Sequence, residues 1–329
     1  MGRVYRARQT GMDRAVALKV LLPQLAANEE LVARFHREMR ATTAIEHPNT
    51  VRVYDYGTAE DGQLFLALEF LEGISLDDVI ADDAPMKPER VAHIARGIAR
   101  ALAAAHHHGI VHRDLKPENV MLVDRYGRGD FVKVLDFGLA RITETNDDEA
   151  LTALGTRVGS PMYMAPEYVD SFAVSPSNDL YALGVLMYQM ATGRTPFRGR
   201  PHELLGKHLE EIPAPPSKYA PVPQWLEELI QQLLAKTPEE RPQLAEEVVA
   251  WLEKWSPEAE ADIRAFEDET GKQVPAGSPR PGAPAKGASP PPAPSAEQRL
   301  LWILTAAIVV LGLLGLGLGV VLLFLAQQP

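Results

Sequence analysis

The stretch that decides the fold is His112-Arg113-Asp114-Leu115-Lys116-Pro117-Glu118-Asn119, followed in order by Asp136-Phe137-Gly138 and Ala165-Pro166-Glu167. Asp114 carries a carboxylate that can accept a proton from an attacking hydroxyl. Asn119 lies five residues later, and Asp136 follows Asn119 by 17 residues. Their side chains provide oxygen ligands, which suit a hard cation such as Mg²⁺. The order and spacing of these motifs predict one composite site.

The motifs resemble those of the bacterial eukaryotic-like (Hanks-type) Ser/Thr protein kinases, and the resemblance covers residues 1 to about 252. It implies an α+β, two-lobed protein-kinase fold, with a strand-rich small lobe before a helical large lobe. It also implies transfer of the ATP γ-phosphate to Ser or Thr hydroxyls of protein substrates, with Mg²⁺, or Mn²⁺ in its place, as the metal. Asp114 would be the catalytic base, Lys116 would steady the γ-phosphate, and Asn119 and Asp136 would hold the metal ions.

Lys19 stands in Val-Ala-Leu-Lys, and the resemblance makes it the ligand of the α- and β-phosphates. Glu38 follows 19 residues later on an expected helix, from which its carboxylate could pair with Lys19. The alternative for Glu38 is a solvated surface side chain. The position between Val-Ala-Leu-Lys and Glu46-His47-Pro48-Asn49 favours the ion pair.

The adenine site is also expected from the resemblance. Val4, Ala17 and Met121 match the positions that sandwich the adenine ring, although apolar residues in strands are ordinarily plain core. The hinge would be Leu68-Glu69-Phe70-Leu71, with Leu68 as the gatekeeper. The Glu69 carbonyl and the Leu71 backbone would bond the adenine edge.

Regulation is expected between Asp136 and Glu167. Arg113 directly precedes the catalytic Asp, which marks the subgroup whose activation loop is ordered when an arginine pairs with a phosphate. Thr152 and Thr156 are the first candidates for autophosphorylation, and the alternative is that they only solvate a loop. By the same resemblance, the stretch 159–167 matches the docking segment, which receives the substrate peptide. Within it, Ser160 stands where the family commonly has Thr, and its hydroxyl could contact Asp114 and Lys116.

Three further features have structural interpretations. Glu167 is expected to pair with Arg241, and Asp179 to brace the catalytic loop. The triplet His106-His107-His108 could suggest a metal site, but consecutive helical side chains diverge by about 100° and cannot easily converge on one ion. A polar helix end before Gly109 is the preferred interpretation.

Composition narrows the function. The chain has 329 residues and a formal net charge of −11, which argues against a nucleic-acid partner. It has no cysteine, so disulfides, thiol nucleophiles and Cys-based zinc sites are excluded. The first 20 residues carry five basic side chains and no apolar run, so no signal peptide is expected.

The chain is expected to have three regions: a kinase domain at 1–255, an acidic and then Pro/Ala-rich disordered linker at 256–298, and a transmembrane helix at 299–326. Within the first region, hydrophobic patterns predict strands and helices. The strands are Val16–Val20, Val51–Tyr56 and Leu64–Phe70, and the helices are Glu29–Ile45, Val91–His106 and Leu180–Thr192.

Residues 300–325 are apolar throughout and carry no charge. About 26 helical residues span roughly 39 Å, which exceeds the ~30 Å hydrocarbon core. The prediction is a single-pass cell-membrane protein in contact with the lipid bilayer. Lys286 and Arg299 precede the span, so the positive-inside rule places the kinase domain in the cytoplasm. Gly315 and Gly319 have the spacing of a helix-dimerisation motif, so a homodimer is considered.

One motif is incomplete. The family's Gly-x-Gly-x-x-Gly-x-Val loop is matched only at its end, by Gly2-Arg3-Val4. The first strand and the earlier glycines are therefore expected to lie before Met1, with Met1 an internal methionine of a longer reading frame. The alternative is a real truncation, and the chain would then be a catalytically impaired kinase fold acting as a membrane scaffold.

Overall fold

The architecture is that of a computed structural model, which describes residues 2–26, 28–125, 128–139 and 161–255. The chain divides into two units, Met1–Pro279 and Arg280–Pro329, and every described residue lies in the first. The predicted linker and transmembrane helix lie outside the described residues. In the part of the chain that is described, no helix combines the length and apolarity needed to cross a bilayer.

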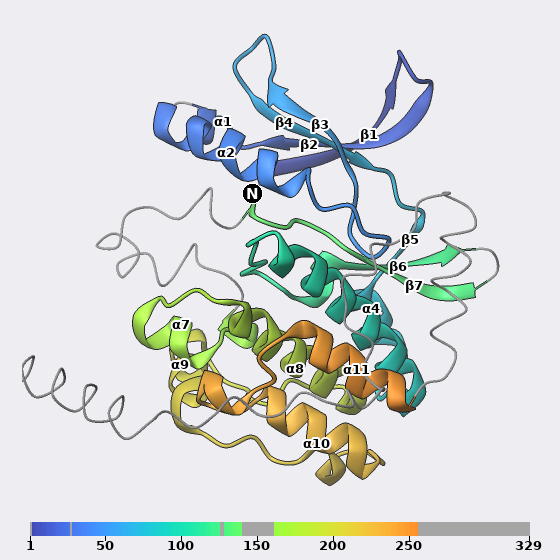
Figure 1. Cartoon of the computed structure of the whole chain (residues 1–329), viewed down its shortest axis with the longest axis vertical. Helices are drawn as coiled ribbons and strands as arrows, with labels where there is room; N and C mark the ends of the chain where they lie inside the picture. Colours follow the sequence, from blue (N-terminus) through green and yellow to red (C-terminus); the bar gives the residue numbers. More distant parts are fainter. Residues whose placement is uncertain (1, 27, 126–127, 140–160, 256–329) are drawn as a thin grey trace, which may run out of the picture. The chain divides into compact units, whose positions relative to one another are not determined.

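The N-terminal part, through Glu69, is a four-stranded antiparallel sheet with a helix beside it (Figure 1). The strand order is β1-β2-β4-β3. Its elements are β1 (Gly2–Gln9), β2 (Arg14–Leu21), α1 (Pro23–Ala26), α2 (Glu29–Thr42), β3 (Val53–Thr58) and β4 (Leu64–Glu69). This is the expected strand-rich small lobe.

Helix α2 begins at an asparagine cap, because the Asn28 side chain accepts hydrogen bonds from the Glu30 and Leu31 amides at 2.9 and 3.2 Å. The helix buries Phe35, Met39 and Thr42. Leu31, one turn before Phe35, is only half-buried. The buried side chains pack toward the sheet and fix which side of α2 is turned to the site.

The part from Gly73 onward is mainly helical and includes a three-stranded sheet, β5-β6-β7 (Figure 1). Its elements are β5 (Gly73–Ser75), α3 (Leu76–Asp83), α4 (Pro88–His107), η1 (Pro117–Asn119), β6 (Val120–Arg125), β7 (Arg128–Val134), η2 (Pro161–Tyr163), α7 (Pro166–Ser171), α8 (Pro176–Thr192), α9 (Pro201–Glu210), η3 (Pro216–Lys218), α10 (Gln224–Leu233), η4 (Pro238–Glu240) and α11 (Ala245–Trp255). This is the expected helical large lobe.

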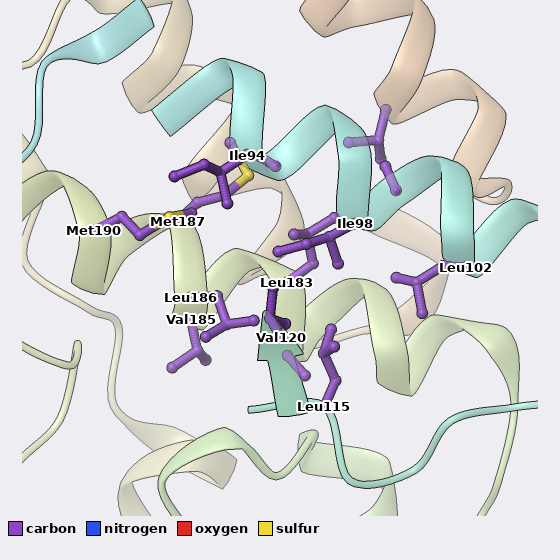
Figure 2. Close-up of a cluster of buried hydrophobic side chains, with 14 of the residues drawn as sticks. Ile94, Ile98, Leu102, Leu115, Val120, Leu183, Val185, Leu186, Met187 and Met190 are labelled. Carbon is purple, nitrogen blue, oxygen red and sulfur yellow. The ribbon is translucent and has the colours of Figure 1, made fainter. Parts of the chain in front are cut away.

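The core of the large lobe forms around α4 and α8. Figure 2 shows Ile94, Ile98 and Leu102 of α4 turned toward side chains of α8 and toward Leu115 and Val120. A Cβ on Gly184 would lie 2.7 Å from the Leu233 Cβ, so glycine is required where α8 meets α10. Leu115 directly follows Asp114 and Val120 directly follows Asn119, and both are buried in this core, so the catalytic loop is anchored beside each of its two polar residues.

Candidate active site

The site joins the two lobes through an ion pair. Lys19 of β2 places its Nζ 2.6 Å from Asp136 Oδ2, in the segment that follows β7. The Lys19 residue is only 6% exposed. The ion pair is short and largely shielded from water, and its two residues come from different lobes. It therefore marks the place where a charged ligand could contact both lobes.

The catalytic loop is organised around Asp114. Lys116 Nζ lies 2.8 Å from Asp114 Oδ2. Asn119 Nδ2 donates to the Asp114 backbone carbonyl at 2.8 Å and lies 3.4 Å from Asp114 Oδ2. The structure therefore brings these three predicted residues together, with a carboxylate, a cation and an amide within hydrogen-bond reach.

The backbone of this loop is held by a buried carboxylate of α8. Asp179 Oδ2 accepts from the His112 amide at 2.8 Å, and Asp179 Oδ1 accepts from the Arg113 amide at 2.9 Å. Arg113 has φ 66°, a left-handed conformation that is strained for a residue with a side chain. Asp179 stabilises this conformation next to Asp114, which confirms its predicted bracing role.

The ionised state of Asp179 is protected. Burial by itself would raise the pKa of Asp179, but the hydrogen bond and charge of His106, with help from His112, lower it. His106 Nε2 lies 2.7 Å from Asp179 Oδ2. Asp179 thus keeps both acceptor oxygens at neutral pH, so the two loop amides stay bonded.

The segment after β7 packs on α2. The Phe137 ring contacts the His112 ring edge-on at 4.8 Å, and the Thr42 hydroxyl donates to the Phe137 carbonyl at 3.4 Å. Gly138 has φ 74°, and a Cβ there would lie 3.1 Å from Thr42 Oγ1 and 3.9 Å from Glu38 Oε2. Glycine is therefore needed at position 138 for both conformation and space.

Glu38 differs from its prediction. Its carboxylate lies near Gly138, but within the described residues the ion-pair partner of Lys19 is Asp136 rather than Glu38. Asp136 takes this place because it has φ 60°, which turns the chain after β7 so that Oδ2 meets the lysine.

Val4 and Ala17 lie on the Lys19 face of the sheet. Val4 pairs with Lys19 across β1 and β2, and Ala17 is two residues before Lys19, so all three side chains share one face. Val4 is 63% exposed, although it is apolar. From the other lobe, Met121 stands between the core residues Val120 and Leu122, so strand alternation turns it away from that core. These placements agree with an apolar site that a flat ring could cover.

The predicted hinge is tied by the Glu69 side chain. Glu69 Oε2 lies 2.7 Å from Lys133 Nζ of β7 and accepts from the Arg52 amide at 3.3 Å. The Glu69 amide donates to the Arg52 carbonyl at 2.9 Å. Within the described residues, the Leu71 backbone makes no hydrogen bond, so its amide and carbonyl are available to a ligand.

The residues suit a divalent cation at Asn119 and Asp136. Asn119 uses its Nδ2 within the loop, and in the described part of the chain its Oδ1 has no hydrogen-bond partner. Asp136 pairs with Lys19 through Oδ2. The remaining oxygens are hard donors of the kind that Mg²⁺ and Mn²⁺ take.

The predicted ion pair behind the docking segment is confirmed. Arg241 bonds Glu167 bidentately, from Nη1 to Oε1 at 2.8 Å and from Nη2 to Oε2 at 2.9 Å. Asn178 Nδ2 donates to Glu167 Oε1 at 2.8 Å. Thr152, Thr156 and Ser160 lie outside the described residues.

Sequence reasoning missed two contributors. His106 was interpreted only as part of a polar helix end. It stands four residues after Leu102, which is buried, and so lies on the inner face of α4. This spacing could have predicted that the side chain of His106 points into the protein. Lys133 carried no signal, because a lysine in a strand pattern gives no indication of a partner 64 residues away.

A two-lobed fold with a base, a lysine and two metal-ligand candidates at the lobe junction is the architecture of a phosphotransferase. Residues 1–251 match the family model of the protein kinase domain. Serine/threonine-protein kinase pkn3 of Myxococcus xanthus is 44% identical over 260 residues, covering 77% of this chain and 47% of that protein. Serine/threonine-protein kinase PknB of Mycolicibacterium smegmatis is 37% identical over 258 residues, covering 77% and 40%.

Among solved structures, the kinase domain of Mycobacterium tuberculosis PknI is similar, with a TM-score of 0.60 and 28% identity, covering 77% of this chain and 91% of that one. The chain therefore belongs to the protein kinase domain family. It spans about half or less of the length of these two curated relatives.

Proposed function

We propose that the chain is a Ser/Thr protein kinase, which transfers the γ-phosphoryl group of ATP to hydroxyls of protein substrates. The observation that carries the proposal is the convergence of Asp114, Lys116 and Asn119 in one loop, next to the Lys19–Asp136 ion pair. The named serine/threonine-protein kinases among the relatives support the same specificity.

Each residue has a role in this reaction. Asp114 orients the substrate hydroxyl and accepts its proton, and Lys116 places positive charge beside that oxygen. Lys19 is the cation for the nucleotide phosphates, and Asn119 and Asp136 would hold the divalent cation. When bound, the divalent metal ion would neutralise part of the negative charge of the phosphates. Catalysis would therefore consist of positioning and charge stabilisation by pre-arranged groups.

The test is phosphate transfer from labelled Mg-ATP to a generic basic protein by the full chain and by Asp114→Asn. Asparagine keeps the size of the side chain but removes the proton acceptor, so transfer should fall by about 10²-fold or more. Asp82→Asn, on the exposed surface of α3, is the matched control and should keep wild-type activity. Equal activity of Asp114→Asn and wild type would overturn the proposal.

We extend the proposal to the membrane: residues 299–326 anchor the chain as a single span, with the kinase domain in the cytoplasm. The support is the uncharged apolar run at 300–325 and the basic residues Lys286 and Arg299 before it. Alkaline carbonate extraction of cell membranes tests the anchor. The full chain should stay in the pellet, a chain ending at residue 295 should become extractable, and extraction of the full chain would contradict the anchor.

We propose that autophosphorylation regulates the kinase. Arg113 could pair with a phosphate in the segment that holds Thr152 and Thr156. After incubation with Mg-ATP, peptide mapping should find phosphate in residues 139–160 of the wild type and none in Asp114→Asn. An active wild type without phosphate in that segment would rule the proposal out.

Dimerisation through the span would raise the local concentration of one activation segment near the partner's site. The span alone, in a membrane two-hybrid reporter, should lose its signal on Gly315→Ile or Gly319→Ile. Gly317→Ile is the matched control, because two residues of rotation place it on another helix face. A signal that none of these substitutions changes would reject the glycine contact.

A further inference from the structure

His208 is a buried histidine on α9, and neither the active-site prediction nor the proposed function uses it. Its residue is 0% exposed. The imidazole packs edge-on against the Phe197 ring at 5.0 Å and the Tyr181 ring at 5.6 Å. Helix α9 contacts η2, the segment Pro161–Tyr163 in which peptide docking is expected. His208 therefore lies between the central helix α8 and the docking segment.

The contact of the ring with Tyr181 bears on its tautomer. His208 Nδ1 lies 2.8 Å from the Tyr181 hydroxyl. Burial, and secondarily Lys236, lowers the pKa of His208 to about 4, so the ring is neutral at pH 7. If the Tyr181 hydroxyl donates to Nδ1, the single ring proton is on Nε2. A neutral, oriented donor is then directed away from Tyr181.

The ring nitrogen left for the docking segment is Nε2, because Nδ1 faces Tyr181 and α9 packs against η2. Backbone carbonyls of Met162 and Pro161 act on the ring and raise the pKa of His208 against the larger effect of burial. Nδ1 is occupied by Tyr181, so these carbonyls belong to the Nε2 side. Yet Nε2 is buried and, within the described residues, has no hydrogen-bond partner of acceptable geometry. Because an unsatisfied buried N–H costs free energy, a small shift that gives Nε2–H an acceptor is favourable.

The frame that carries His208 is rigid. Lys236 Nζ donates to the backbone carbonyls of Lys207 and His208 at 3.2 and 2.8 Å, which holds the last turn of α9. The Arg241 guanidinium lies over the Tyr181 ring at 4.8 Å and also binds Glu167. The histidine is thus fixed to the same network that anchors the end of the docking segment.

We propose that His208 is a positioning residue for protein substrates: oriented by Tyr181, it donates Nε2–H to the Pro161–Met162 backbone and sets the docking segment when a substrate binds. The inference rests on the proposed kinase function. His208 touches neither the reacting atoms nor the nucleotide residues, so its loss should affect the protein substrate and spare ATP.

The experiment uses the full chain and four substitutions. His208→Leu removes the donor and keeps an apolar side chain, whereas His208→Gln places an amide N–H near the Nε2 position. Tyr181→Phe removes the orienting hydroxyl and keeps the ring. His202→Leu, at a side chain 71% exposed on the same helix, is the matched control. Three quantities are measured: kcat and KM for a generic basic protein, slow ATP hydrolysis without protein, and amide exchange of residues 162–165 with the protein substrate present.

His208→Leu should lower kcat/KM for the protein about three- to tenfold, the range of one hydrogen bond, and leave ATP hydrolysis within about twofold. With the protein substrate bound, it should also speed amide exchange at residues 162–165. His208→Gln should restore most of the loss, and His202→Leu should match wild type. Tyr181→Phe should give a smaller loss of the same kind, and it tests the idea even where His208→Leu fails to fold.

Equal losses with protein and with ATP alone would overturn the inference, as would a His208→Gln variant no better than His208→Leu. If the wild type transfers no phosphate to protein, the proposed function fails. The exchange measurement with the protein substrate present then decides the positioning role separately: faster exchange at residues 162–165 in His208→Leu supports it, and unchanged exchange rejects it.

Discussion

Replacement of Asp179 by asparagine is the most direct test of how the catalytic loop is held. The carboxylate accepts from His106 and His112 on Oδ2 and from the Arg113 amide on Oδ1. Asparagine has one acceptor oxygen, so in either orientation its NH₂ group meets at least one backbone N–H. Leaving a buried donor unsatisfied costs about 1–3 kcal/mol, and the other bonds lose their charge assistance. The expected loss of unfolding free energy is about 2–4 kcal/mol.

Activity should fall along with stability. Arg113 keeps its left-handed conformation through the bond to Asp179, and Asp114 is the next residue. A displacement of the base by about 1 Å can lower the rate roughly 10²-fold. The expected signature of Asp179→Asn is thus a lower kcat with little change in the KM for ATP.

The assay is urea unfolding of the full chain in mild detergent, followed by circular dichroism, together with steady-state kinetics. Asp82→Asn makes the same chemical change at an exposed position and should change the unfolding free energy by less than about 0.5 kcal/mol. A stability loss for Asp179→Asn as small as that of the control would refute the bracing argument. So would a stability loss with an unchanged kcat.

Three further results are expected. Burial is the main cause that lowers the pKa of His47 and of His208 from 6.5 to about 4. Between pH 6.5 and pH 4 the unfolded chain therefore binds more protons than the folded chain, and the folded state loses stability as the pH falls. The loss should reach about 3 kcal/mol for each histidine at pH 4, and none is expected above pH 6.5. Stability that stays flat over this window would contradict their burial. Lys19→Met should lower phosphate transfer by about 10²-fold or more, and wild-type rates would remove it from the site. Arg241→Met removes the cation that pairs with Glu167, which keeps only the hydrogen bond from Asn178, and should cost about 3–5 kcal/mol in unfolding by urea; a cost under about 1 kcal/mol would contradict the buried pair.

Element types followed from the sequence because local signals agreed with the packing. Helix α8 was predicted to end at Thr192 and does, because Gly193 has φ 71° and terminates the helix. It begins four residues before the predicted start, at Pro176, where Ser175 and Asn178 form a capping box. The cap was visible in the sequence, but the prediction relied on the apolar pattern alone.

The boundaries that moved did so because of contacts with the other lobe. Helix α2 was expected to reach Ile45 but ends at Thr42. Ile45 is buried in the core cluster of the large lobe, and the Ala44 and Ile45 amides form tighter turns that take the chain there. Likewise β3 starts at Val53 rather than Val51, because the Val51 amide bonds the Val134 carbonyl of β7 at 2.9 Å. A single-sequence pattern carries no information on such partners.

The site residues divide in the same way. Asp114, Lys116 and Asn119 lie within six residues of one another, so a local motif was enough to bring them together. The partner of Lys19 was not local. The choice between Glu38 and Asp136 depends on how α2 and the segment after β7 stand relative to the sheet, which is a tertiary quantity.

The same contacts show what fixes Asp136. Asn49 Nδ2 donates to the Val132 carbonyl at 2.8 Å, the Val134 amide donates to the Asn49 carbonyl at 2.7 Å, and Lys133 pairs with Glu69. These bonds tie three consecutive residues of β7 to the small lobe, and Asp136 follows only two residues later. The Lys19–Asp136 distance is therefore set largely by backbone and buried side-chain bonds on the neighbouring strand. A substitution at Lys19 should for this reason remove a charge from the site without releasing the position of Asp136.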